Sequence, residues 1–120
     1  MVSVRLHRAS SFALIALGFV QMALTPARYG GLTAGAIWFA GTGLAMMLLG
    51  ALNVVVRRGA IRDPVAFSAC RLANAAFVAL GVFAVSAIPE PQTIVTLVLA
   101  LVQAATTLML PRELRREHRG

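Results

Sequence analysis

Apolar residues in this chain form four long runs. The runs cover residues 9–25, 32–56, 65–88 and 94–110. A helix needs about 20 apolar residues to cross the hydrocarbon core of a bilayer, with roughly 17 to 25 tolerated, and each run falls within that range. Backbone amides in hydrocarbon must be hydrogen-bonded within their own segment, and the runs lack the period-2 alternation of barrel strands. The pattern therefore predicts an all-α fold, an integral membrane bundle of four transmembrane helices.

Short polar segments separate the four runs. They are 25-TPARYGG-31, 57-RRGAIRDP-64 and 89-PEPQ-92. Proline, glycine and charged residues in such segments mark turns, and connections this short join antiparallel neighbours. We therefore expect two antiparallel hairpins. Because no linker is long enough to separate two domains, residues 1–120 should form a single transmembrane domain.

Arginines are concentrated on one side of the predicted bundle. The N-terminal segment carries two, the 57–64 link carries three and residues 111–120 carry four, whereas the two hairpin tips together carry only Arg28. Short loops rich in Lys and Arg are retained in the cytoplasm. We therefore predict that both termini and the 57–64 link are cytoplasmic, and that residues 111–120 form a basic cytoplasmic tail.

Composition places the chain in a membrane and narrows its partners. Hydrophobic residues make up 59% and charged residues 12% of the 120 residues, and the mean hydropathy is +0.83, which is outside the soluble range. The net charge of +7 is explained by topology and by anionic lipid headgroups. No nucleic-acid partner is expected, because the basic tail has no interleaved aromatic residues. Arginine without lysine, together with abundant alanine, is typical of a GC-rich bacterial gene, so we expect a multi-pass protein of a bacterial inner (cytoplasmic) membrane.

Residues 1–27 also resemble a secretory signal, with a basic start, an apolar middle and small residues near Ala27. Cleavage there would leave three helices. Pro26 lies awkwardly beside such a cut, so we expect this segment to remain as the first transmembrane helix.

The two halves of the chain show a weak internal similarity. Residues 8–26 align with residues 71–89, and six of the 19 positions are identical. A duplication of this kind would relate the two hairpins as parallel repeats about an axis along the membrane normal, with Arg8 and Arg71 as counterparts. Alanine and leucine inflate chance matches, and the second helices of the hairpins align poorly, so both duplication and coincidence stay open.

Polar residues gather in the half of the bundle that is predicted to face the cytoplasm. Ser68, Arg71 and Asn74 share one face of the third predicted helix, and Asn53 lies about one turn from Arg57 in the second. No carboxylate lies within the four runs, so two interpretations of Arg71 stay open. Its guanidinium either snorkels to the interface, or it forms a cytoplasm-facing pocket for a small anion or an anionic lipid headgroup. In that pocket Asn53, Asn74 and Ser68 would be the accompanying polar groups.

Catalytic and metal-binding chemistry has few candidate residues here. The two histidines, His7 and His118, lie outside the predicted spans, so we expect no metal or haem ligation in the membrane and no cofactor. Arginine and asparagine bind and orient ligands but do not readily supply acid–base catalysis at neutral pH. We therefore expect that the protein is not an enzyme, with a subunit of a lipid-modifying enzyme as the alternative.

Small residues recur at helical spacing in the second run, at Ala36, Ala40, Gly43 and Gly50. Membrane helices associate through close backbone contact along such seams. The sequence thus favours a non-catalytic accessory or structural membrane protein that packs with itself, as a homo-oligomer, or with a larger membrane complex. The alternative is a small dimeric transporter or channel whose pocket surrounds Arg71. A structural hydrogen bond between Trp38 and Gln21 is also expected, because Trp38 lies deeper than an interfacial aromatic residue usually does.

Overall fold

The part of the chain that the structure describes folds into four helices. The structure, a computed structural model, describes residues 2–59 and 62–119, and the side chains as far as Pro111. The helices are α1 (Val2–Arg28), α2 (Ala34–Arg58), α3 (Pro64–Ala87) and α4 (Pro91–Arg119). The prediction of an all-α fold with four helices is confirmed. Each helix contains a segment long and apolar enough to cross a membrane, and in α4 this segment ends at Pro111, so the chain is a small membrane-embedded protein.

The helices extend well beyond the apolar runs at both ends of the chain. The first begins at Val2 instead of residue 9, and the fourth continues through Pro111 to Arg119. An apolar run marks the part of a helix that suits hydrocarbon, whereas the helix itself continues wherever the backbone can hydrogen-bond. The segment predicted as a basic tail is therefore helical as far as Arg119, while its side chains after Pro111 lie outside the described part of the structure.

Local capping explains where two of the helices begin. The Thr33 hydroxyl accepts the N–H of Ala36 at 3.1 Å at the start of α2. The Asp63 carboxylate accepts the N–H of Val65 at 2.9 Å at the start of α3, where Pro64 occupies the first turn. Both arrangements satisfy backbone donors that have no partner within the helix.

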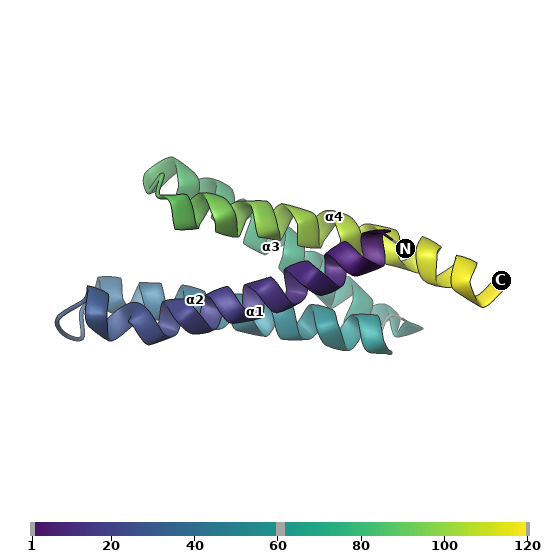
Figure 1. The fold of residues 1–120 in the computed structure, drawn as a ribbon, viewed down its shortest axis with the longest axis horizontal. Helices are drawn as coiled ribbons and strands as arrows, with labels where there is room; N and C mark the ends of the chain where they lie inside the picture. The colour runs from purple at the N-terminus through teal and green to yellow at the C-terminus, as the bar shows by residue number, and fades with distance from the viewer. Residues whose placement is uncertain (1, 60–61, 120) are drawn as a thin grey trace.

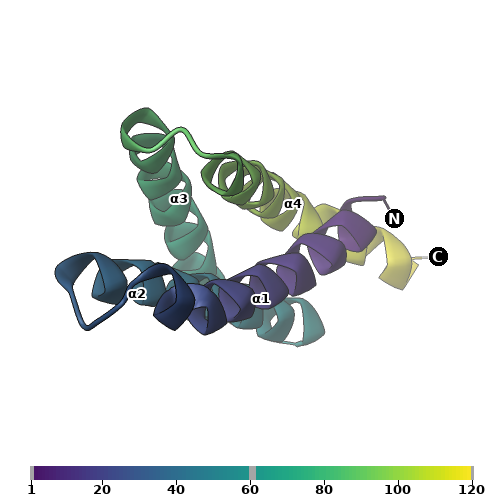
Figure 2. The same ribbon diagram turned by 60° about the vertical axis from the view of Figure 1, so that its left-hand side comes forward.

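The helices are arranged as two pairs that converge at one end. Figure 1 shows that α1 runs along α2 and that α3 runs beside α4, with the start of α1 and the end of α4 at the same end. The first helix also packs against α4, whereas α2 and α3 contact each other much less. At the opposite end, where the 29–33 and 88–90 turns lie, the two pairs diverge (Figure 2).

Close backbone contact holds α1 against α2. A Cβ atom added to Gly18 would lie 2.4 Å from the carbonyl oxygen of Gly43, and one added to Gly50 would lie 2.6 Å from that of Ser11. Glycine is required at these positions because any larger residue would force the helices apart. Two members of the predicted small-residue seam, Gly43 and Gly50, therefore lie at this interface.

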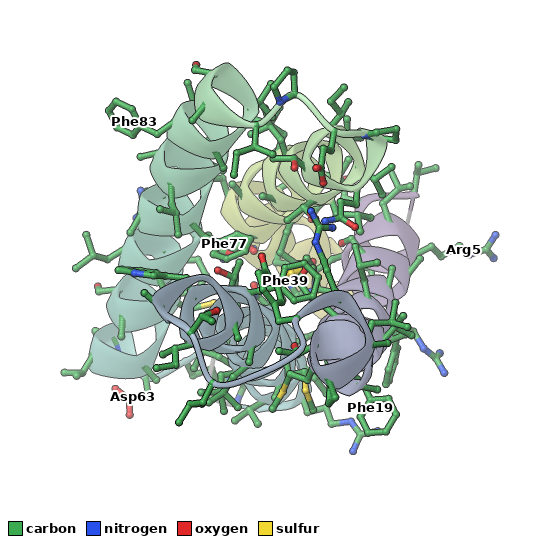
Figure 3. The ribbon with its side chains drawn as sticks, turned by 90° about the vertical axis from the view of Figure 1, so that its left-hand side faces the viewer. Arg5, Phe19, Phe39, Asp63, Phe77 and Phe83 are labelled. Atoms are coloured by element: carbon green, nitrogen blue, oxygen red, sulfur yellow. The ribbon has the colours of Figure 1, made fainter. Side chains whose placement is uncertain are left out.

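The apolar core lies between the two helix pairs. It is built around Leu14, Met46, Leu49, Phe77 and Ala100. Figure 3 shows Phe77 and Phe39 pointing into the space between the helices, whereas Phe19 and Phe83 point away from it. The latter two are 63% and 73% exposed. Large apolar side chains on the outer surface suit contact with lipid.

Candidate functional site

A cluster of buried polar side chains connects all four helices near the converging end. We call this cluster the basic-end network, because the arginines of the N-terminal segment and of the α2 end lie beside it. None of its members is more than 3% exposed. They are His7, Ser10 and Ser11 of α1, Asn53 of α2, Cys70 and Asn74 of α3, and Gln103 and Thr107 of α4.

A reciprocal amide pair lies at the centre of the basic-end network. Asn53 Nδ2 donates to Asn74 Oδ1 at 3.1 Å, and Asn74 Nδ2 donates to Asn53 Oδ1 at 2.9 Å. Asn53 Oδ1 also accepts from Thr107 Oγ1 at 2.9 Å and lies 3.2 Å from Cys70 Sγ. A single oxygen atom of α2 is therefore bonded to both α3 and α4.

The imidazole of His7 extends the network from this oxygen to a charged side chain. Its Nε2 lies 3.1 Å from both Asn53 Oδ1 and Thr107 Oγ1, and its Nδ1 lies 3.2 Å from Arg57 Nη1. A guanidinium only donates, so Nδ1 is the acceptor and the ring proton is assigned to Nε2, where Asn53 Oδ1 accepts it. The ring thus links the α2 end to the polar centre.

Gln103 closes the network against α1. Its Oε1 accepts from Ser10 Oγ, and its Nε2 donates to Ser11 Oγ at 2.9 Å. The same nitrogen lies 3.0 Å from His7 Nε2, but both nitrogens carry hydrogen in this tautomer, so that contact is not a hydrogen bond. Ser11 Oγ in turn donates to the backbone oxygen of His7 at 2.6 Å. Among the described residues, no buried side-chain nitrogen or oxygen lacks a hydrogen-bond partner. A fully bonded network of this kind stabilises and specifies one helix arrangement.

The chemistry of this network is that of neutral donors and acceptors. Amides, hydroxyls, a thiol and one imidazole meet there, with Arg57 at the margin. Over the described part of the chain, no three histidine, cysteine, aspartate or glutamate side chains lie close enough together to hold a metal ion. The arrangement can therefore fix the orientation of the helices relative to one another, through hydrogen bonds between their side chains.

The structure divides the residues that the sequence grouped as one pocket. Asn53 and Asn74 meet in the basic-end network, as described above, whereas Ser68 and Arg71 lie on the exposed surface of α3. There they line a separate hollow of about 420 Å³ with Ala104 and other residues of α3 and α4. The guanidinium carbon of Arg71 lies 5.8 Å from the centre of the Phe67 ring, within the range of a cation–π contact.

His7 is a member of the site that the apolar pattern does not predict. The sequence places it outside the first transmembrane span, whereas it lies in α1 and is fully buried. The signal was present in the spacing, because Ser3, His7, Ser11, Leu14 and Gly18 follow one another at intervals of three or four residues and are all buried. The helical periodicity of these polar and small residues predicts a helix that begins before the apolar run does.

A second region lies at the opposite end, where the two helix pairs diverge. We call it the tip cleft; it has a volume of about 270 Å³ and is lined by residues of all four helices and of the 29–33 and 88–90 turns. Arg28 Nη2 lies 3.1 Å from Glu90 Oε1 and 3.2 Å from Glu90 Oε2, so an ion pair connects the two helix pairs across it. The guanidinium carbon of Arg28 also lies 5.0 Å from the centre of the Phe39 ring.

The aromatic residues of the tip cleft are arranged differently from the expectation. The predicted hydrogen bond between Trp38 and Gln21 is wrong, because Gln21 Nε2 donates to the backbone oxygen of Phe39 at 2.7 Å and Trp38 is 74% exposed. Tyr29 packs against Phe39 with ring centres 5.7 Å apart. The cleft therefore has a fixed aromatic side, and Trp38 lies at its surface.

No protein-family model, no curated protein and no solved structure matches this chain. Its function is therefore inferred from the basic-end network, the tip cleft and the outer surface of the bundle.

Proposed function

We propose that this protein is a non-catalytic accessory or structural membrane protein that packs with a second copy of itself or within a larger membrane complex. The observation that carries the proposal is the completeness of the basic-end network, in which every buried polar group bonds to another group of the chain. Polar groups that already hydrogen-bond to one another stabilise helix packing, and this favours a structural role over substrate turnover.

The outer surface supports self-association. An apolar groove of about 410 Å³ lies between α2 and α3, two helices that contact each other much less than the members of either helix pair do. Ala45, Ala73 and Ala76 line it together with larger leucine side chains and Phe77. Close helix approach through small residues is the usual basis of association in membranes, so we assign this groove to a helix of a second copy.

Native mass spectrometry from a mild detergent, with partners and lipids retained, tests this proposal directly. A homo-oligomer or a complex with another membrane protein is the expected result, whereas a monomer carrying only lipid would overturn it. Disulfide cross-linking tests whether the groove is the interface between the copies. Ala76→Cys, in the groove, should form dimers on oxidation. Val82→Cys, which is 50% exposed outside the groove, should not. Cys70 is fully buried, so it should not contribute to the product.

The proposed setting is the inner membrane of a bacterium, with both termini cytoplasmic and anionic headgroups near the arginines. Gly30 and Gly59 allow a matched test, because an added side chain at either position meets nothing within 4 Å. Gly30→Cys should react with an impermeant thiol reagent applied to intact cells, and Gly59→Cys should react only after lysis. Labelling of Gly59→Cys in intact cells would reverse the orientation.

One observation favours a second candidate function, the small dimeric transporter or channel. The hollow at Ser68 and Arg71 presents a positive charge beside apolar walls, which is suited to an anion or a lipid headgroup. Chloride and phosphate flux into proteoliposomes would support this candidate if Arg71→Gln abolished it and Arg58→Gln did not. Equal flux in protein-free liposomes would exclude it.

A further inference from the structure

We propose that the tip cleft is a binding site for a small zwitterionic amphiphile, a molecule or lipid headgroup that carries an ammonium group close to a carboxylate or phosphate and has an apolar body. This inference goes beyond a packing role, and it rests on residues at the end of the bundle away from the basic-end network.

The paired charges at the cleft define the class of ligand. Arg28 and Glu90 bond to each other across the cleft, and their side chains are 43% and 41% exposed. A ligand with one charge would take one member of this pair and leave the other without its partner, so the ion pair would compete with the ligand. A zwitterion offers an anion to Arg28 and a cation to Glu90 at once, so both charges stay paired when it binds.

The charged groups are held in place before any ligand arrives. Glu90 Oε2 accepts from Gln92 Nε2 at 3.3 Å, and the Arg28 guanidinium rests over the Phe39 ring. Phe39 is itself fixed by the bond from Gln21 to its backbone oxygen. A site whose groups are already oriented loses less entropy on binding than a flexible one.

The opposite wall of the cleft is apolar and sets the size of the ligand. Residues of α3 form it, among them Phe77, Leu80 and Ala84. Figure 3 shows Phe77 and Phe39 facing the same central space. The cavity of about 270 Å³ is slightly smaller than a pocket for a drug-sized molecule, so it suits a short apolar body attached to a compact headgroup.

Trp38 makes binding measurable without a label. It is the one tryptophan of the chain, and it lines the cleft. Purified protein in a non-ionic maltoside detergent would be titrated with L-leucine as the soluble probe. Two analogues with the same apolar body serve as matched controls: 3-methylbutylamine, which lacks the carboxylate, and 4-methylpentanoate, which lacks the ammonium. A separate arm would compare phosphatidylglycerol nanodiscs with and without phosphatidylethanolamine.

The expected result is a saturable change in Trp38 fluorescence with a zwitterion, and half-saturation at a concentration about tenfold higher or more for each single-charge analogue. A response to leucine alone would identify a soluble ligand, and a response to phosphatidylethanolamine alone would identify a lipid headgroup; both support the proposal. No response to either zwitterion, or equal responses to leucine and its analogues, would overturn it.

A pair of α3 variants locates the response. Ala84→Phe should fill the cleft and abolish the fluorescence change, whereas Val82→Phe, on the same helix but outside the cleft, should preserve it. Equal retention by both variants would place the ligand elsewhere and overturn the assignment. The comparison of analogues in the unaltered protein keeps the test decisive even if Ala84→Phe fails to fold.

Discussion

The two ends of the bundle are held together by different interactions. At the basic end, fully buried amides, hydroxyls and an imidazole join all four helices. At the tips, a single ion pair between half-exposed side chains spans a cleft. A buried polar network lies in a medium of low dielectric and has no water to replace a lost partner, whereas an exposed ion pair is screened and competes with water.

The basic end of the molecule is therefore closed by buried hydrogen bonds, whereas the tip end contains an open cleft. The converging end is fixed by directional bonds that leave no buried polar group unpaired among the described residues. The diverging end keeps its space because the helix pairs separate there, as Figure 2 shows. We therefore expect the basic end to set the relative position of the helix pairs. At the tips, each charged group stays oriented within its own helix pair, and only the spacing between the pairs adapts to a ligand.

The largest expected loss of stability comes from a substitution in the small-residue seam between α1 and α2. Gly43→Leu should lower the free energy of unfolding by about 3 kcal/mol, because even a Cβ atom at this position would lie 2.8 Å from the carbonyl oxygen of Gly18. Gly41→Leu, in the same helix, is the control, since an added side chain meets nothing within 4 Å there. Thermal unfolding in the same detergent measures both. Similar losses would show that the seam does not limit helix approach.

A smaller but still substantial loss should follow from opening the basic-end network. Asn53→Ala removes the oxygen that accepts from Asn74 and Thr107, and stranded buried donors cost about 1–3 kcal/mol, less where the unfolded state in a membrane finds other partners. We expect a loss of roughly 2 kcal/mol. Gln21→Ala, which removes one side-chain-to-backbone bond near the tips, should lose well under half of that. A larger loss in Gln21→Ala would reverse the assignment of rigid and adaptable ends.

Several features of the fold could be predicted from the sequence because they depend on local patterns. The four helices follow from apolar runs, and the polar character of the half near Asn53 and Asn74 follows from their positions in those runs. His7 was missed because hydropathy reports the preference of a segment for hydrocarbon, and a helix does not end where that preference ends. Its burial depends on contacts with α2 and α4, which are distant from it in the sequence.

Arg71 shows a second limit of prediction from the sequence, which concerns the side of a helix on which a residue lies. It lies three residues from Asn74, and sequence spacing placed both on one face, but three residues are still about 60° apart around a helix. That angle is enough to place Asn74 inside the bundle and Arg71 on its surface. The pairing of Arg28 with Glu90 has no local signal at all, since 62 positions separate them and only the tertiary arrangement of the two helix pairs brings these two side chains within reach.

The tip ion pair should affect geometry more than stability. Glu90→Gln removes the charge that connects the helix pairs, so spin labels at Gly30 and Ile88 should report a broader distance distribution in this variant. Labels at Val2 of α1 and Leu108 of α4, which lie in different helix pairs near the converging end, should report no change. Added salt should broaden the tip distance of the unaltered protein in the same direction, because the pair is partly exposed. If both distances broaden together, the two ends are not independent.

The smallest expected effect concerns Arg71, a surface arginine that is not part of the basic-end network. If Arg71 and Ser68 bind an anionic headgroup in their hollow, Arg71→Gln should reduce the amount of anionic lipid that co-purifies with the protein. Arg58→Gln should reduce it less, because Arg58 lies at the exposed end of α2, where water and salt screen its charge. Arg71→Lys separates two modes of action: it should restore retention if only a positive charge at the interface is needed, and should restore it poorly if the planar guanidinium binds a phosphate with two donors. Quantitative lipid analysis of matched preparations measures all three variants. Equal lipid loss from Arg71→Gln and Arg58→Gln would show that Arg71 is one more charge on the basic side, and the hollow would then have no binding role.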